Sequence, residues 1–263
     1  MKTFRSEYIN DYSTYTFGYT EYAVMQSQSD IPAIYDNGFL PYTGNTDISQ
    51  PVFYLARSLR VRLEDFSDSS ENRRVNRKFS DTPAEVIRHN IEDFDIKDKK
   101  FTDFCLDYAK QRFSNGSLDG RRLNYILSNK IATDIFEIKV SNSNTLLGYI
   151  IAVVYANTFH YWFSFYNTVI AAAKPLGKWL MWKMIRWAQE EGLEYIYLGT
   201  AYGPKALYKV RDFKALEFFD GNFWNDNTSL LKQLCKGDEV VKKADLFKLM
   251  PDPGAFIDKI LKK

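Results

Sequence analysis

Two lysines and a tyrosine near residue 205 are spaced for anion binding. They are Lys205, Tyr208 and Lys209, and they closely follow the strand-like segment Leu193–Gly199. Residues four apart lie on one side of a helical turn, so Lys205 and Lys209 are expected to face one cleft, with Tyr208 beside them. Two converging ammonium groups repel each other unless an anion, a phosphate or a carboxylate, lies between them. Surface lysines around a core tyrosine explain the same spacing.

A second candidate binding surface is the basic stretch from residue 57 to residue 78. Its seven cations outnumber four interspersed carboxylates, and they are Arg57, Arg60, Arg62, Arg73, Arg74, Arg77 and Lys78. Such a stretch predicts a cationic surface that attracts phosphates without regard to sequence. A solvated basic face explains the pattern equally well. The net charge of the chain is only +2, so any polyanion site depends on this uneven distribution.

The histidines and cysteines carry little chemical signal. His89 and His160 lack a serine or cysteine nucleophile in any recognisable motif, and we interpret both as structural. Cys105 and Cys235 lie far apart, without further ligands at metal-binding spacing. Neither a metal site nor a disulfide is therefore expected, and a reducing compartment is the simplest interpretation.

The helices and strands that must position these residues are predicted most clearly in the C-terminal half of the sequence. A helical pattern opens at Pro175 and stops at Gly192, and a short helix is expected over Pro204–Val210. β-branched and aromatic runs predict strands at Asp134–Val140, Leu146–Tyr155, Phe159–Tyr166, Leu193–Gly199 and Leu216–Trp224.

The order of these elements predicts the sheet. A crossover helix between the third and fourth of these strands forces the two to run parallel in an otherwise antiparallel sheet. This order is typical of the GNAT (N-acetyltransferase-like) fold, an α/β (α+β) class. We expect the parallel strands to diverge at their C-terminal ends and open a cleft. Tyr166, which ends the third strand, and Tyr202, just past the fourth, would border it.

The rest of the chain is less regular. Residues 1 to 55 predict irregular structure with short strands, whereas residues 82 to 130 predict helices around Ala84–Asn90 and Phe101–Arg112. We therefore expect a smaller, basic N-terminal domain (1–80), a GNAT-like domain with a helical lead-in (81–235) and a charged helical tail (236–263). The two halves are also compatible with one shared core.

The loop before the crossover helix argues against an acetyl-CoA donor. Acetyl-CoA enzymes of this fold use a glycine-bearing loop whose N–H groups bind the pyrophosphate. Here the segment 169–177 offers a single glycine, Gly177, and Pro175 removes one donor. Another activated acyl donor is favoured, and no cofactor is expected.

Two segments of the chain resemble the leucyl/arginyl-tRNA–protein transferase family, bacterial branch. The first runs from Tyr35 through Asp36, Asn37, Gly38 and Phe39 to Arg60, Arg62, Phe66, Ser70 and Arg73-Arg74-Val75, and is similar to that family's Gly-Phe-Arg segment and the arginine-rich stretch after it. The second comprises Tyr195–Gly199, Lys205, Tyr208-Lys209, Phe213, Leu216-Glu217 and Trp224, which looks like its Tyr-Leu-Gly, Lys-x-x-Tyr-Lys, Leu-Glu and Trp signature. Together they cover most of residues 15 to 225.

Two departures from the family pattern stand out. The segment Pro51–Ser58 contains no cysteine where the family has a cysteine cluster, so no metal or iron–sulfur role is expected. Leu40 rather than arginine follows the Gly-Phe pair, which removes one anion contact and points to altered specificity.

The resemblance implies a reaction and residue roles. An arginyl or leucyl group would pass from aminoacyl-tRNA to the N-terminal α-amine of a protein starting with Asp or Glu, as in N-degron arginylation. Tyr166, Tyr202, Lys205, Tyr208 and Lys209 would serve catalysis, and the basic stretch would bind tRNA. Acceptor binding would fall to Asp36, Gly38, Phe39 and Glu217, although Asp36-Asn37-Gly38 is equally explained as a turn.

Two other functions stay open: an acyl-CoA-dependent N-acyltransferase, and a non-catalytic tRNA- or peptide-binding protein of the same fold. No signal peptide and no run of roughly 18 apolar residues, as a membrane span requires, is present in the sequence. A cytoplasmic protein without a membrane partner is expected.

Overall fold

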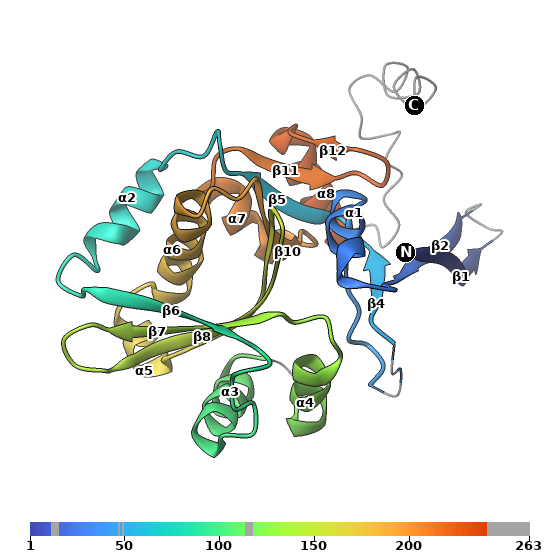
Figure 1. Ribbon diagram of the computed structural model, residues 1–263. Helices are drawn as coiled ribbons and strands as arrows, with labels where there is room; N and C mark the ends of the chain where they lie inside the picture. The colour runs from blue at the N-terminus through green and yellow to red at the C-terminus, as the bar shows by residue number, and fades with distance from the viewer. Residues whose placement is uncertain (12–15, 47, 49, 114–117, 241–263) are drawn as a thin grey trace.

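A mixed eight-stranded sheet organises the part of the chain that the structure describes. The computed structural model describes residues 1–11, 16–46, 48, 50–113 and 118–240. The strands of the large sheet lie in the order β12 (Trp224–Asn225), β11 (Leu216–Phe219), β5 (Ser58–Arg62), β10 (Tyr195–Thr200), β9 (Thr158–Tyr166), β8 (Leu146–Tyr155), β7 (Asp134–Val140) and β6 (Ala84–Asn90). The predicted strands of the C-terminal half are therefore all present in one sheet (Figure 1).

Strands β9 and β10 pair in parallel, as the crossover order predicted. Tyr195 lies opposite Thr158, and the pairing ends at Tyr197 and His160. Both strands continue beyond these residues, to Thr200 and Tyr166. The other neighbours in the sheet pair antiparallel within the described residues. The divergence of β9 from β10 is confirmed, and none of the described strands pairs with the C-terminal part of β9 on that side.

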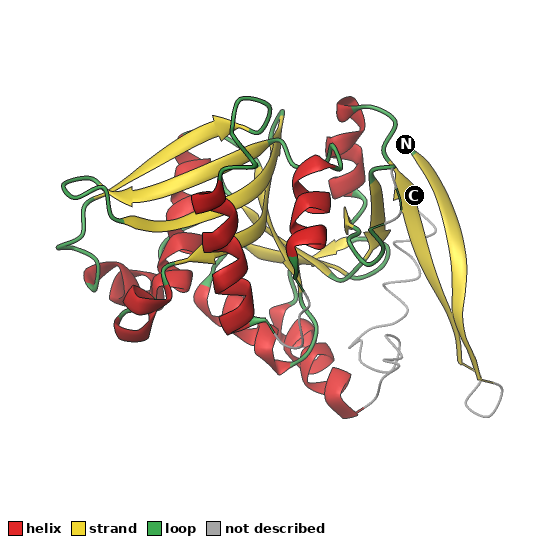
Figure 2. Cartoon of the chain, turned by 90° about the horizontal axis from the view of Figure 1, so that it is seen from below, coloured by secondary structure: helices red, strands yellow, loops and turns green. Residues whose placement is uncertain are grey.

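Helices cover both faces of the sheet (Figures 1 and 2). One face packs against the crossover helix α6 (Leu176–Glu190), which lies beside α2 (Ser70–Arg77), and against α7 (Leu207–Asp212) and α8 (Thr228–Val240). The other face packs against α3 (Lys99–Arg112) and α4 (Gly120–Ser128). The short helix α5 (Thr168–Ala173) leads from β9 into α6. The amphipathic pattern after Pro175 therefore becomes a helix buried along one side.

The N-terminal residues form a second, smaller sheet of order β1 (Lys2–Asp11), β2 (Thr16–Val24), β4 (Val52–Leu55) and β3 (Phe39–Pro41). A turn, η1 (Gln28–Asp30), and the helix α1 (Ile31–Asp36) join β2 to β3. The expectation of irregular structure over residues 1 to 55 is wrong here, because β1 and β2 pair over most of their length and extend away from the large sheet (Figure 2).

The helix predicted around Ala84–Asn90 is also wrong. This segment is the edge strand β6, antiparallel to β7 from Ala84 to Asn90, and not a helix. In a stretch of only seven residues the hydrophobic periodicity does not distinguish a helix from a strand. The segment becomes a strand because it pairs with β7. The helix expected around Phe101–Arg112 is confirmed as α3.

Strand β5 links the two halves of the chain. It belongs to the stretch expected to form the N-terminal domain, yet it lies between β10 and β11 in the large sheet. Residues 1–80 and 81–235 thus share one sheet, and the division into domains stays a prediction. Of the tail expected over 236–263, the first residues end helix α8, and residues 241–263 lie outside the described residues.

Gly38 fixes the end of α1 against the large sheet. Its φ is +81°, a left-handed conformation, and a Cβ at this position would collide with the ring of Phe219 on β11. Its carbonyl accepts a hydrogen bond from Ser58 Oγ on β5 at 2.5 Å. The Asp36-Asn37-Gly38 turn is therefore a docking point between the helix α1 and the strands β5 and β11.

Gly38→Ala is expected to destabilise the fold by about 2–5 kcal/mol, since left-handed strain and overpacking add. Gly192→Ala is the matched control: its φ is +72° with no heavy atom within 4 Å of a Cβ, so only the strain of about 1–2 kcal/mol applies. Denaturant unfolding of both variants measures the difference. Equal losses of stability would show that the contact with Phe219 contributes nothing.

Candidate functional site

A cavity lies where β9 has lost its parallel partner. Its volume is ≈ 460 Å³, and its lining residues come from β9, from the first turn of α6, and from α3 and α7. Those used below are Tyr108, Ser164, Tyr166, Gly177, Lys178 and Tyr208. The cavity therefore brings together two of the predicted site residues, Tyr166 and Tyr208, at the predicted end of the strands.

A bulge in β9 turns its last residues toward this cavity. Ile151 of β8 lies opposite Phe163, and Ala152 lies opposite Tyr161, so Trp162 is an extra residue. One extra residue exchanges the two faces of a strand. Tyr161, before the bulge, packs with α6, whereas Phe163 and Phe165, after it, pack with the α3 and α4 side. Ser164 and Tyr166 then lie on the α6 side, where the cavity is.

Gly177 has a packing role in this site. A Cβ on it would lie 2.8 Å from the hydroxyl of Tyr166, so only glycine lets that ring lie against the first turn of α6. The ring of Tyr166 also contacts Tyr108 of α3, with centroids 4.6 Å apart. The single glycine of the 169–177 loop thus makes room for a tyrosine, which explains its presence without a phosphate ligand.

Tyr208 supplies a neutral hydroxyl to the cavity. It lies in the first turn of α7 and is half-buried, and burial raises its pKa to about 12, with the nearby Tyr166 adding to the effect. A phenol with such a pKa keeps its proton at neutral pH, so Tyr208 can donate a hydrogen bond.

Lys209 does not converge with Lys205 on a shared anion. Its Nζ donates to the carbonyls of Leu198 at 2.6 Å and Thr200 at 3.2 Å, at the end of β10. Burial lowers the pKa of Lys209 to about 8. Lys205 lies exposed in the turn η3 (Pro204–Ala206). The expectation that both lysines face one cleft is wrong, because Lys209 donates its hydrogen bonds to the end of β10 whereas Lys205 lies exposed in the preceding turn.

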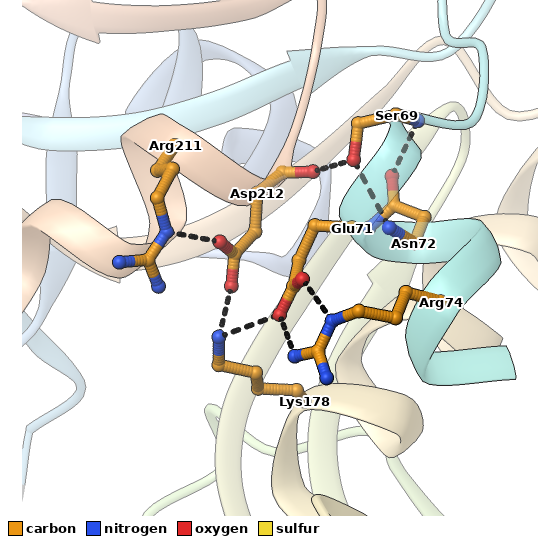
Figure 3. A network of polar contacts seen from close by, with 7 residues as sticks. All are labelled: Ser69, Glu71, Asn72, Arg74, Lys178, Arg211 and Asp212. Atoms are coloured by element: carbon orange, nitrogen blue, oxygen red, sulfur yellow. Dashed lines mark hydrogen bonds and ion pairs between the residues drawn. The ribbon is translucent and has the colours of Figure 1, made fainter. Parts of the chain in front are cut away.

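An ion-pair network borders the cavity (Figure 3). Lys178, on the first turn of α6, lies 2.7 Å from Asp212 Oδ2 and 3.2 Å from Glu71 Oε1. Arg74 donates to both oxygens of Glu71, and Arg211 pairs with Asp212 at 2.8 Å. The Arg74 hydrogen bond outweighs desolvation and, with Lys178, lowers the pKa of Glu71 to about 2. The network ties α2 to α6 and α7 and neutralises Lys178.

The structure divides the predicted basic stretch into two groups. The arginines near β5 face internal partners, whereas Arg73, Arg74, Arg77 and Lys78 are exposed on and just after α2. Arg60 is buried, and its guanidinium lies 3.8 Å from the ring centre of Tyr195 and 4.1 Å from that of Trp224. Arg57 and Arg60 are therefore largely buried and not part of an exposed basic surface, whereas Arg62 is partly exposed and paired with Glu217 and Asp65. Within this stretch the α2 group is the one that is exposed, and its role in binding a polyanion stays a prediction.

Asp36 and Glu217 are partners of the buried Arg60, and Glu217 is also a partner of the partly exposed Arg62. Arg60 pairs with Glu217 at 2.7 Å and with Asp36 at 3.2 Å, and Arg62 also pairs with Glu217. Burial would raise the pKa of Glu217, but hydrogen bonds from Arg62 and Arg60 outweigh it and lower the pKa. Both carboxylates are thus engaged by guanidinium groups, and neither lines the cavity at β9. Phe39 is buried in the small sheet.

Tyr202 lies apart from Tyr166. Its ring is half exposed and stacks with Arg57 at 4.8 Å, its hydroxyl accepts a hydrogen bond from the Arg57 N–H, and Arg57 also pairs with Asp238 of α8 at 2.8 Å. It lines separate cavities with Leu55 and not the one at β9. The two tyrosines expected to border one cleft are therefore on different surfaces.

His160 behaves as a structural residue. Its Nδ1 lies 2.9 Å from the hydroxyl of Tyr35, and its side chain is buried beside Tyr197 and Trp162. Burial, helped by Lys209, lowers the pKa of His160 to about 3, so the ring is neutral.

Comparisons with known proteins place the fold. A family model described as an acetyltransferase (GNAT) domain matches residues 132–213, which run from the start of β7 to the end of α7. The fold class is that of a GNAT acyltransferase domain with a mixed, mostly antiparallel sheet, as predicted. None of the helices in the described residues is long and apolar enough to cross a membrane.

Curated relatives are transferases at modest identity. The aspartate/glutamate leucyltransferase of Xylella fastidiosa (strain M12) is 31% identical over 127 residues, which cover 44% of this chain and 49% of that protein. The protein of the same name from Xanthomonas oryzae pv. oryzae (strain PXO99A) is 40% identical over 57 residues, or 21% and 23% of the two chains. This chain matches about half or less of the length of these relatives.

Solved structures give more distant likenesses. L-PGS from Bacillus licheniformis is 14% identical with a TM-score of 0.41, covering 66% of this chain and 52% of that chain. FemX is 12% identical with a TM-score of 0.45, covering 81% and 72%. At such scores these likenesses carry no argument about activity.

The stability of the protein is expected to depend on the ionisation of Lys209. Its pKa is about 8 in the fold against an ordinary 10.5, so between these values the unfolded chain binds more protons. Stability then rises with pH across this window, by up to about 3 kcal/mol. The measurement is the difference in unfolding free energy between wild type and Lys209→Met from pH 7 to pH 10.5. Lys205→Met, at an exposed site, is the control, and a flat difference for Lys209→Met would contradict the burial of its ammonium.

Proposed function

We propose that this chain is an aminoacyltransferase that moves an amino acid from charged tRNA to the N-terminal α-amine of a protein. One observation carries the proposal. The lining of the cavity at the divergence of β9 and β10 includes the hydroxyl-bearing side chains of Tyr108, Ser164, Tyr166 and Tyr208, together with Arg112. Lys178, which also lines the cavity, is already paired with two carboxylates. Such a cavity suits the ester and ribose at a tRNA 3′ end better than the pyrophosphate of a coenzyme.

The reaction needs little acid–base assistance. An aminoacyl ester is already activated, and an α-amine with a pKa near 8 is partly neutral at pH 7. The amine nitrogen attacks the ester carbonyl, the bond to the ribose oxygen breaks, and that oxygen takes up a proton. Orientation of amine and ester can supply about 7–11 kcal/mol of the barrier. Hydroxyls such as that of Tyr208 can donate to the carbonyl oxygen or to the leaving ribose oxygen.

The exposed cations of α2 support the tRNA part of the proposal. Arg73, Arg77 and Lys78 are exposed on the helix that the Lys178 network holds beside the cavity. A tRNA whose acceptor stem lay along α2 would bring its 3′ end to the cavity at β9. The amino acid is proposed to be arginyl or leucyl and the acceptor to begin with Asp or Glu, on the strength of the leucyltransferase-like sequence segments.

The two rival functions predict different ligands. An acyl-CoA enzyme would need a pyrophosphate site at the N-terminus of α6, where Pro175 offers no N–H and Lys178 is neutralised. A non-catalytic binding protein would bind tRNA or peptide without transfer. Thermal shift with acetyl-CoA, bulk tRNA and an Asp-initiated peptide separates these cases, since a ligand of the native state raises its stability.

Tyr208→Phe is expected to lower the rate of transfer by about 10²-fold, because the hydroxyl donates to charge that develops in the transition state. The assay uses leucyl- and arginyl-tRNA with peptides that begin with Asp, Glu or Asn. Tyr202→Phe, outside the cavity, is the matched control and should keep its activity. An unchanged rate for Tyr208→Phe would remove this tyrosine from the site, and no transfer by wild type on any peptide would overturn the proposal.

Arg73→Gln/Arg77→Gln is expected to weaken tRNA binding and to lower the dependence of log affinity on log salt concentration by about one counterion per lost contact. Arg74 is left unchanged because it belongs to the Glu71 network. Lys97→Gln/Lys100→Gln, at exposed positions at the start of α3, removes the same charge as a control. Equal effects of the two double variants would mean that the net charge, and not the α2 surface, sets the affinity.

A further inference from the structure

One buried hydroxyl beside the cavity has no hydrogen-bond partner in the described part of the chain. Tyr161 is 5% exposed, and its hydroxyl oxygen neither donates nor accepts a hydrogen bond there. It lies on β9 directly before the bulge at Trp162. An unsatisfied hydroxyl in a core reduces stability, so its retention calls for an explanation other than packing, which phenylalanine would provide as well.

The groups around this hydroxyl belong to the cavity. Burial raises the pKa of Tyr161; the side chain of Ser164 opposes this as a hydrogen-bonding neighbour, whereas Tyr208 and Tyr166 raise it further. Ser164, Tyr166 and Tyr208 all line the cavity, whereas Tyr161 is not among its lining residues. The bulge is what brings Tyr161 and Ser164, three residues apart, to the same side of the sheet. Tyr161, with its unpartnered hydroxyl, therefore lies on the same side of β9 as a cavity-lining serine three residues further on.

We propose that Ser164 donates a hydrogen bond to the reacting carbonyl of the acyl donor, and that Tyr161 positions the serine hydroxyl by donating to its oxygen. This inference rests on the proposed function, since it assigns roles within the same cavity. Ser164 Oγ can accept one hydrogen bond while it donates another. A hydroxyl that accepts a bond is polarised and donates more strongly in a dry site. Ser164 is then a catalytic residue, and Tyr161 a positioning residue that acts through it.

The proposed pair of Tyr161 and Ser164 also explains why the chain keeps a buried hydroxyl that reduces the stability of the fold. Ligand binding at the cavity fixes the serine rotamer, so the Tyr161 hydroxyl gains its acceptor when the site is occupied. Without a ligand, the described residues offer this hydroxyl no hydrogen bond. Removing it should therefore leave the fold equally stable or more stable while it lowers the rate of transfer. A residue with a purely structural role would lose stability and rate together.

The test is a double-mutant cycle of Tyr161→Phe and Ser164→Ala in the transfer assay, with kcat and KM measured separately. Ser164→Ala is expected to lower kcat by about 10²-fold with little change in KM, since the bond strengthens in the transition state. Tyr161→Phe should lower kcat by about 10- to 100-fold and leave Tm equal or higher. Because Tyr161 acts through Ser164, adding Tyr161→Phe to Ser164→Ala should change nothing further. Ser164→Thr should recover part of the rate.

Tyr125→Phe is the matched control. Tyr125, on α4, is 8% exposed and also has a hydroxyl without a hydrogen-bond partner in the described residues, but it does not line the cavity. It should keep full activity. Additive losses in the cycle, or a Tyr161→Phe variant with wild-type kcat, would overturn the proposal.

Binding of an amide analogue of 3′-aminoacyl-adenosine, measured by thermal shift, separates this inference from the proposed function. Wild type that neither binds the analogue nor transfers from charged tRNA refutes the proposed function and, with it, this inference. Wild type that binds and transfers while the double-mutant cycle is additive refutes the roles of Tyr161 and Ser164 alone.

Discussion

The interaction on which the site depends is the short parallel pairing of β9 and β10. The pairing ends at His160 and Tyr197, although both strands continue. The bulge at Trp162 begins just after this end, so β9 exchanges its faces where it loses its partner. The backbone of β10 needs other partners there, and Lys209 provides two hydrogen bonds to it. The sheet therefore has a stable opening between β9 and β10, which results from the divergence of the two strands, the bulge at Trp162 and the hydrogen bonds of Lys209.

One buried ion pair, between Arg60 and Glu217, lies away from that opening. Arg60 lies between Tyr195 and Trp224 and pairs with Glu217, so the centre of the β5 and β11 pair is held by a charge-assisted contact. Breaking a buried pair by removing one partner is costly because the other charge is left uncompensated. Arg60 and Glu217 are therefore explained by the docking of α1 and β5, and neither of them lines the cavity at β9.

The sequence predicted the fold where local pattern and connection order agree. The strands from Asp134 to Tyr166, the crossover helix and the parallel pair followed from periodicity and the handedness of crossovers. Prediction failed for Ala84–Asn90, whose seven residues suit either period, and for β5, since nothing local shows that residues 58–62 insert between two strands more than 130 residues further along the chain.

The site was predicted only in part, for a physical reason. Tyr166, at the end of β9, and Tyr208, after the end of β10, were predicted from their positions near strand ends and line the candidate cavity. The sequence did not point to Ser164, which lines the same cavity, because the bulge that turns it to this side has no clear sequence pattern. Arginines and acids resemble site residues when read along the chain, yet Arg60 and Arg62 pair with Glu217 across the sheet, and Arg60 also pairs with the exposed Asp36 of α1.

The packing of the first turn of α6 restricts which acyl donor can bind beside it. In a phosphate-binding loop the helix N-terminus keeps its N–H groups free and a nearby cation unpaired. Here Pro175 precedes the helix, the ring of Tyr166 covers Gly177, and Lys178 is shared by Glu71 and Asp212. A doubly charged pyrophosphate would have to displace a ring and break two ion pairs. An uncharged ester with ribose hydroxyls meets no such cost, so the packing around this turn favours an ester donor over a coenzyme thioester.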